Sequence, residues 1–243
     1  MKNKKILILS MCVLLIIVVG IILFNKDDTS KDKSDALKFK EEYESLNGTV
    51  RESDKAAYND VSIDEDNPIV YVDINETLQI LENKKGIIYI GANWCPWCRT
   101  AVEVMLDVAN DLDIEKIYYL NLDDDKSNFK VEDKKLVEVN HGSKDYYKLL
   151  EALDENLNDY VLTDEEGNKY ETGEKRIYMP YVFTVKNGKV ADSHLSTVAL
   201  DEGQTKYDSL TEKQYEELYD IYYEMFNELY NASKTCSSKE KCD

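Results

Sequence analysis

Positive charge and histidine are both scarce in this sequence. Lysine and arginine number 30 against 49 aspartate and glutamate residues, which gives a formal net charge of −19 at pH 7. A surface of this sign repels phosphate backbones, so nucleic-acid binding is not expected, and we interpret the charge as maintaining solubility. His141 and His194 have no partner pattern around them in the sequence, so surface or core positions are expected for both. An apolar fraction of 43% still allows a sizeable core.

The first 25 residues differ in composition from the rest. Lys2, Lys4 and Lys5 precede an uncharged run at residues 6–24, whose 19 residues span roughly 28 Å as a helix, close to the hydrocarbon thickness of a bilayer. The basic flank is expected to stay cytoplasmic, which places the rest of the chain on the outer side. A cleaved signal peptide is the alternative, but the run is long and no small-x-small cleavage motif follows it. Residues 1–25 are therefore predicted to be a single-pass membrane anchor.

Three further segments follow the predicted anchor. Residues 26–67 are expected to begin as a polar stalk and to continue as a helical extension that packs on the main domain. The main domain is predicted to span residues 68–232, and residues 233–243 are predicted to form a flexible tail. Strand-like runs alternate with helical periodicity in the domain, which indicates an α/β fold with a central mixed sheet flanked by helices. The predicted strands are residues 69–72, 87–90, 117–122, 181–185 and 189–191; the predicted helices are residues 75–83, 101–112, 146–157 and a closing helix from the N-cap Thr211; residues 123–135 are expected to be a charged loop, and a small hairpin is expected across residues 161–170.

The sequence WCPWCR at residues 94–99 lies where a predicted buried strand gives way to a predicted amphipathic helix. Free backbone N–H groups and the positive dipole end at a helix start favour a thiolate at the first cysteine. The spacing of three residues places the second cysteine one turn away, within disulfide reach. Cys95 is therefore expected to be the exposed nucleophile and Cys98 the more buried, resolving cysteine. Pro96 suits the first helical turn because it has no N–H group that needs a partner there.

Two other roles for this cysteine pair are weighed against a redox role. A zinc site needs further ligands, and the sequence has no second CxxC pair near the two histidines. A purely structural disulfide between Cys95 and Cys98 closes so few residues that it stabilises the fold little. Redox chemistry is therefore the favoured interpretation, and no bound metal or cofactor is predicted.

Residues 87–99 resemble the active-site strand and turn of the thioredoxin superfamily, including a tryptophan, Trp94, before the first cysteine. That family also has a cis-proline that faces the CxxC pair at the start of a hairpin strand. Met179 and Pro180, followed by an apolar strand and the turn at residues 187–188, match this position. Proline tolerates a cis peptide bond far better than any other residue and, lacking an N–H group, also fits a strand start.

The resemblance covers the main domain and implies roles for several residues. It implies that the peptide bond before Pro180 is cis and that the backbone of Met179 pairs with a bound substrate strand. It also implies that Trp94, Pro96 and Trp97 border the substrate. The function that it implies is thiol–disulfide exchange with protein clients.

Three departures from the thioredoxin pattern are visible. Thioredoxins have a buried acid six residues before the first cysteine, but this chain has Tyr89, which cannot act as a base near neutral pH and argues against efficient general reduction. Residues 124–175 form an insertion that is expected to add a helix and a hairpin beside the substrate groove. The dipeptide Pro-Trp at residues 96–97 differs from the Gly-Pro of thioredoxins and is closer to the proline–aromatic pair of glutaredoxins. Membrane-anchored thioredoxin-like proteins, including accessory proteins linked to bacteriocin export, are the most similar group suggested by these features.

Four remaining features leave alternatives open. Arg99 either favours a Cys98 thiolate electrostatically or is simply solvated. Cys236 and Cys242 are expected to form a small-loop disulfide outside the cytoplasm, with a second redox pair as the alternative. The aspartates at residues 123–125 lack the glycine and glutamate of a calcium loop, so a solvated loop is expected. Finally, an inert thioredoxin-fold adaptor for a membrane partner is the alternative to an enzyme, and the direction of electron flow stays open.

Overall fold

The computed structural model describes residues 35–237, with side chains up to residue 230. The predicted membrane anchor at residues 1–25, the start of the predicted stalk and residues 238–243, which include Cys242, lie outside the described residues. Among the helices of the described part, none is both long and apolar enough to cross a bilayer.

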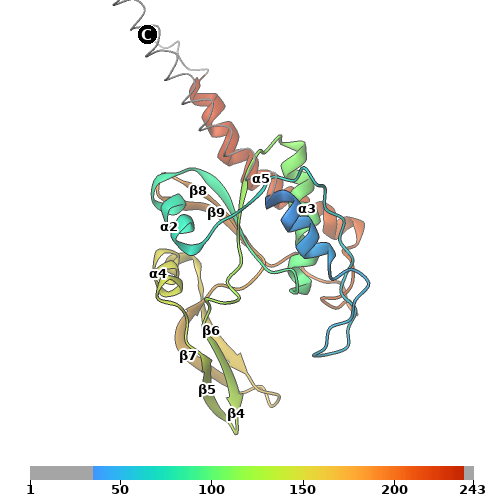
Figure 1. Ribbon diagram of the computed structural model, residues 1–243, viewed down its shortest axis with the longest axis vertical. Coiled ribbons are helices and arrows are strands. Elements are labelled where there is room, and N and C mark those ends of the chain that lie inside the picture. Colours follow the sequence, from blue (N-terminus) through green and yellow to red (C-terminus); the bar gives the residue numbers. More distant parts are fainter. Residues whose placement is uncertain (1–34, 238–243) are drawn as a thin grey trace, which may run out of the picture.

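A five-stranded mixed sheet forms the centre of the domain (Figure 1). The strand order is β1-β3-β2-β8-β9, in which the first three strands run parallel and the last two are antiparallel to their neighbours. The strands are β1 (Ile69–Tyr71), β2 (Gly86–Ile90), β3 (Ile117–Leu120), β8 (Tyr181–Lys186) and β9 (Lys189–Leu195). The α/β class and the mixed central sheet expected from the sequence are therefore confirmed.

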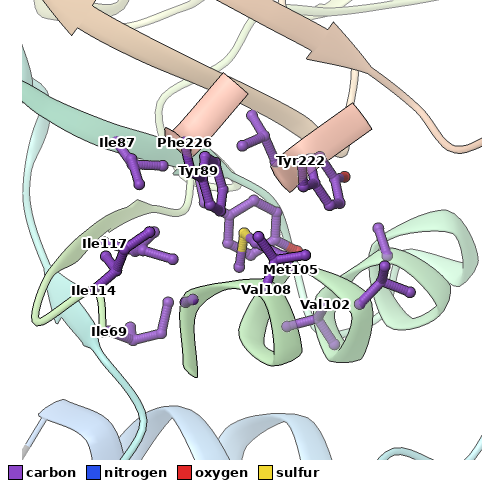
Figure 2. Packing of buried hydrophobic residues seen from close by; sticks show 14 of the residues in the cluster. Ile69, Ile87, Tyr89, Val102, Met105, Val108, Ile114, Ile117, Tyr222 and Phe226 are labelled. Atoms are coloured by element: carbon purple, nitrogen blue, oxygen red, sulfur yellow. The ribbon is translucent and has the colours of Figure 1, made fainter. Parts of the chain in front are cut away.

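Helices cover both faces of this sheet. They are α2 (Ile74–Asn83), α3 (Pro96–Asp111), α4 (Lys144–Ala152) and α5 (Glu212–Ser237). Alternate residues of β2 point to opposite faces, so Ile87 and Tyr89 join the core under α3 and α5, whereas Ile88 and Ile90 join the core under α2 and α4. Figure 2 shows the first of these cores, with Tyr89 in the layer that also holds Met105 of α3 and side chains of α5.

Reciprocal capping pairs define the starts of two helices. Asp73 and Glu76 form a reciprocal capping box at the start of α2. Thr211 and Gln214 do the same at the start of α5, as predicted: the amide of each residue donates to the side chain of the other, at 2.9 and 3.4 Å. Helix α5 then continues to Ser237, beyond the predicted start of a flexible tail at residue 233, so Cys236 lies in its last turn.

The extension before the sheet is part of the same core as the sheet. A helix at residues 35–44 buries Phe39 and Tyr43 completely against the α3 face, and Val61 and Ile63 from the following segment join them. The expected packing of this extension on the main domain is therefore confirmed.

The insertion between β3 and β8 contains two hairpins, whereas only one was expected. These are β4 (Asn128–Glu132) with β5 (Lys135–Asn140), and β6 (Asn158–Thr163) with β7 (Lys169–Arg176). The expectation of a charged loop at residues 123–135 is confirmed for residues 123–127 and wrong for the rest, because Asp133 and Lys134, at φ 49° and 58°, form a two-residue hairpin turn without the usual glycine. Helix α4 also ends earlier than expected, and the 3₁₀ turn η1 (Asp154–Asn156) follows it. The hairpins extend beyond the sheet at the end away from the C-terminal part of α5 (Figure 1).

Candidate functional site

The two cysteines lie at the start of α3. Cys95 is the N-cap residue with an extended backbone, at φ −79° and ψ 118°, and Pro96 occupies the first helical turn. Cys98 follows on the same turn, and both thiols are free. Because the N–H groups of a first turn have no partners within the helix, they point toward a charge that forms at the N-cap.

Burial of the pair differs from the expectation for one of the cysteines. Cys98 is 0% exposed, but Cys95, which was expected to be exposed, is only 6% exposed. The reason is that Ala92, Trp97 and Met179 pack around the sulfur atoms in a small apolar cluster of their own. Cys98 is nevertheless the more buried of the two, as predicted.

A segment remote in sequence faces Cys95. The Met179–Pro180 peptide bond is cis, as the resemblance implied, and Pro180 directly precedes β8. The Cys95 Sγ atom lies 3.7 Å from the main-chain oxygen of Met179, to which the thiol donates. Since β8 pairs with β2, the sheet itself brings this segment next to the start of α3.

The two thiols differ in acidity. The pKa of Cys95 is lowered because the Cys98 thiol donates a hydrogen bond to it, with help from the backbone N–H groups of Cys98 and Trp97 and from the charge of Arg51. Burial raises the pKa of Cys98 well above its ordinary value of 9.0, and the neighbouring Cys95 raises it further. Cys95 is therefore the more acidic thiol of the pair, and Cys98 is the less acidic one.

Sequence reasoning missed Arg51, which comes from the extension. Its side chain is 17% exposed, its Nη1 atom donates to the main-chain oxygen of Trp94 at 3.3 Å, and its Nε atom lies 3.3 Å from Asp54. The guanidinium also lies over the rings of Tyr58 and Tyr207, at 5.8 and 5.6 Å from their centroids. No local signal in the sequence marks this arginine, because it reaches the site from a segment without helical or strand periodicity.

Trp94 links the site to the insertion. Its ring is 38% exposed, and its Nε1 atom donates to Asp123 at 2.5 Å. Lys126 lies over the same ring, 5.0 Å from its centroid, and forms an ion pair with Asp123 at 2.5 Å. Asp123, the first residue of the aspartate run, is thus tied to the indole. In the described part of the chain, no three His, Cys, Asp or Glu side chains are grouped as a metal site would need.

Arg99 is not solvated, contrary to one of the two expectations, because its side chain is 1% exposed. The expected electrostatic effect on a Cys98 thiolate stays a prediction. The Arg99 guanidinium donates to the main-chain oxygens of Asn59, Tyr43 and Asn93 and to the side chain of Asn47. Arg99 therefore fastens the extension to the first turn of α3.

The remaining candidates lie apart from the cysteine pair. His141 lies on the insertion; its side chain is 72% exposed, and its Nδ1 atom lies 2.7 Å from the Glu138 carboxylate. His194 on β9 is partly buried, and desolvation lowers its pKa. Cys236 lies in α5, but its side chain and the whole of Cys242 are outside the described residues, so the predicted tail disulfide stays a prediction.

A scan against protein-family models and a search of curated proteins found no match to this chain. The class of the protein therefore follows from its geometry. It is an α/β domain with a mixed central sheet and a close Cys95–Cys98 pair at a helix start, an arrangement compatible with a thioredoxin-like fold.

Proposed function

We propose that this protein is a thiol–disulfide oxidoreductase that exchanges disulfides with protein clients through Cys95 and Cys98. The observation that carries the proposal is the placement of the pair: Cys95 is the N-cap residue of α3, with its sulfur 3.7 Å from the main-chain oxygen of Met179, and Cys98 lies fully buried on the same first turn. The pKa of Cys95 is lowered and that of Cys98 is raised, which agrees with this placement. A lowered pKa supplies a thiolate, and the thiolate is the species that attacks disulfides.

The reaction takes two exchanges. The Cys95 thiolate attacks one sulfur of a client disulfide, a Cys95–client bond forms, and the other client sulfur leaves as a thiolate. Cys98 then attacks Cys95 Sγ, so that the Cys95–Cys98 bond forms and the client sulfur is released. The client disulfide is reduced by two electrons and the enzyme pair is oxidised by the same two, and the reverse sequence oxidises a client dithiol.

Client binding is assigned to the segment around Met179 and to the residues that flank the cysteines. The main-chain oxygen of Met179 is 3.7 Å from Cys95 Sγ, so an extended client strand paired with this backbone would place its disulfide beside the nucleophile. Trp94 offers an exposed ring next to this position and Trp97 a partly exposed one, whereas Pro96 between them in the sequence is buried. Because Cys95 is 6% exposed, the site favours disulfides on flexible segments over disulfides inside rigid folds.

The setting of the reaction also belongs to the proposal. The apolar run at residues 6–24 would anchor the chain in a membrane, and the basic residues before it would leave the α/β domain on the extracytoplasmic side. This organisation resembles that of membrane-anchored thioredoxin-like proteins, including accessory proteins linked to bacteriocin export. The proposed chemistry needs no bound cofactor.

Trapping tests the proposal directly. Cys98→Ala should accumulate mixed disulfides with clients, because the second exchange is blocked, and Cys95→Ala should abolish insulin reduction and trapping together. Trapped species that persist when both cysteines are replaced would refute the mechanism, and a wild-type pair that never exchanges would favour an adaptor. Equilibration with glutathione would give the direction of flow, since potentials in this fold run from about −270 to −120 mV.

A further inference from the structure

Arg51 is held against the main chain of the active-site turn by several contacts. Its Nη1 atom donates to the main-chain oxygen of Trp94, the residue before Cys95, at 3.3 Å. Its guanidinium lies over the rings of Tyr58 and Tyr207, at 5.8 and 5.6 Å from their centroids. Because only 17% of the side chain is exposed, a cation that is normally solvated is fixed beside the residue that precedes the nucleophile.

A tight turn in the extension gives this arginine its place. The amide of Arg51 donates to the main-chain oxygen of Ala56 at 2.9 Å, and the amide of Lys55 donates back to that of Arg51 at 3.1 Å. Lys55 closes the turn with a φ of 60°. One oxygen of the Asp54 carboxylate then lies 3.3 Å from the Arg51 Nε atom and accepts from the Ala56 amide. The turn therefore presents the guanidinium together with a counter-ion.

A loop from the far end of the chain reaches the same turn. Tyr207 lies at residues 196–211, between β9 and α5, and its hydroxyl donates to the second oxygen of the Asp54 carboxylate. The loop is attached to α5, because Gln214 donates from Nε2 to the main-chain oxygen of Ala199 at 3.0 Å. Tyr207 thus contacts both members of one ion pair: its ring faces Arg51, and its hydroxyl binds Asp54.

The two rings that hold the guanidinium each hold a second cation. Arg99 of α3 lies 5.5 Å from the centroid of Tyr58, and the Lys206 ammonium lies 5.1 Å from that of Tyr207. The negative faces of the rings offset the repulsion among these cations. Asp54 supplies the negative charge in direct contact with this group.

The Tyr207 hydroxyl affects how far Asp54 offsets the arginine. A carboxylate that accepts a hydrogen bond from Tyr207 shares its negative charge with that donor, and this bond is the main reason that the pKa of Asp54 is lowered. More of the positive charge of Arg51 then acts on the active-site turn. In agreement, the pKa of Cys95 is lowered first by the Cys98 thiol and further by the charge of Arg51.

We propose that Tyr207 is a positioning residue that holds Arg51 at the active-site turn, and that the guanidinium so held favours the Cys95 thiolate over the thiol. This inference rests on the proposed function and adds the extension turn at residues 51–56 and the loop at residues 196–211 to the site. In the first exchange the Cys95 thiolate bonds to one client sulfur, and the other client sulfur leaves with the electron pair. Arg51 and Tyr207 keep their protons and act through position and charge alone.

Alkylation of Cys95 by iodoacetamide across a range of pH tests the proposal, because only the thiolate reacts. The full chain is used in reduced form, with serine in place of the three other cysteines, Cys12, Cys236 and Cys242. Mass spectrometry of the labelled peptide shows that Cys95, and not the fully buried Cys98, carries the label.

Two variants of Tyr207 separate its hydroxyl from its ring. Tyr207→Phe keeps the ring over Arg51 and should slow alkylation at neutral pH about twofold, whereas Tyr207→Leu loses both contacts and should slow it about fourfold. In both, the midpoint of the pH profile should move upward, while the plateau at high pH, where the thiol is fully ionised, should not fall. A merely loosened fold would instead speed alkylation at every pH, because Cys95 is only 6% exposed.

Two controls complete the design. In an Arg51→Ala background, Tyr207→Phe should have no further effect, because no guanidinium remains to be held. Tyr170→Phe is the matched control, since the Tyr170 hydroxyl also donates to a carboxylate, that of Asp164 at 2.9 Å, but in the hairpin of β6 and β7. Its alkylation profile should equal that of the wild type.

The outcomes separate this inference from the proposed function. An upward shift in Tyr207→Phe that disappears in the Arg51→Ala background would support the inference. Unshifted profiles in both Tyr207 variants, or the same shift with and without Arg51, would overturn it and leave the oxidoreductase proposal intact. A wild-type chain that releases no coloured thiolate from a symmetrical nitrothiobenzoate disulfide would refute the proposed function and the inference together.

Discussion

Removal of the Arg99 guanidinium should destabilise the fold strongly. The group is 1% exposed and donates to four acceptors, at 2.7 Å to Asn59, 2.7 Å to Tyr43, 3.2 Å to Asn93 and 2.6 Å to Asn47. Hydrogen bonds that involve a charged group contribute about 1.5–3 kcal/mol each, and loss of one partner leaves the others buried and unpaired. Water can reach some of the freed acceptors, so we expect Arg99→Ala to cost about 4 kcal/mol in free energy of unfolding.

Denaturant titration and thermal unfolding would measure this loss. For a domain of this size about 4 kcal/mol corresponds to a fall in Tm of roughly 10 °C. Arg99→Lys should lose more than half as much, because one ammonium cannot span the acceptors that the planar fork reaches. Lys130→Ala is the control, since its ammonium is 51% exposed and only pairs with Glu132 at 3.2 Å.

Limited proteolysis would show where the loss occurs. Without Arg99 the segment that follows the helix at residues 35–44 loses its attachment to α3, so trypsin should cut after Arg51 and Lys55 faster than in the wild type. An Arg99→Ala protein that unfolds within about 1 kcal/mol of the wild type, with an unchanged digestion pattern, would refute the reasoning.

Two other predictions concern pH. Arg51→Ala should raise the pKa of Cys95 and so move the pH profile of Cys95 alkylation upward, although Asp54, 3.3 Å from the guanidinium, already offsets part of the arginine charge. Arg51→Lys should stay closer to the wild type. An unchanged alkylation profile in Arg51→Ala would contradict an electrostatic effect of Arg51 on Cys95. Burial lowers the pKa of His194 below its ordinary 6.5, so the folded state favours the neutral imidazole; this contribution to stability is full above pH 6.5 and is lost as the pH falls through the lowered value. His194→Gln should therefore lose less stability than the wild type between neutral and acid pH. Equal dependence of the unfolding free energy on pH in the two proteins would contradict this.

Several strands and turns of this fold can be predicted from the local sequence pattern alone. The apolar runs that became β2 and β8 were identified because buried strands are almost continuously hydrophobic, and the hairpin turn at Asn187 and Gly188 has the residues that positive φ angles require. The hairpin of β4 and β5 escaped detection because its turn is built from Asp133 and Lys134, and a charged pair signals a loop more strongly than it signals a turn.

In the candidate site too, features set by neighbouring residues were predictable from the sequence, and features set by distant residues were not. Cys95 and Cys98 were identified from spacing and from the strand-to-helix transition, since both are properties of neighbouring residues. The low exposure of Cys95 was not foreseen, because Met179 reaches it from 84 positions further along the chain. Arg51 was missed for the same reason, since a side chain that acts across a fold leaves no periodicity in its own segment.

Spacing and hydrophobic period were thus sufficient to place two sulfur atoms one turn apart at the start of a helix that follows a buried strand. They could not reveal that Arg99 fastens the extension, or that Tyr43 contacts Tyr89, because these contacts join residues 56 and 46 positions apart. Helix and strand patterns arise from interactions within a few residues, whereas the surroundings of the thiols arise only when the sheet has brought distant segments together.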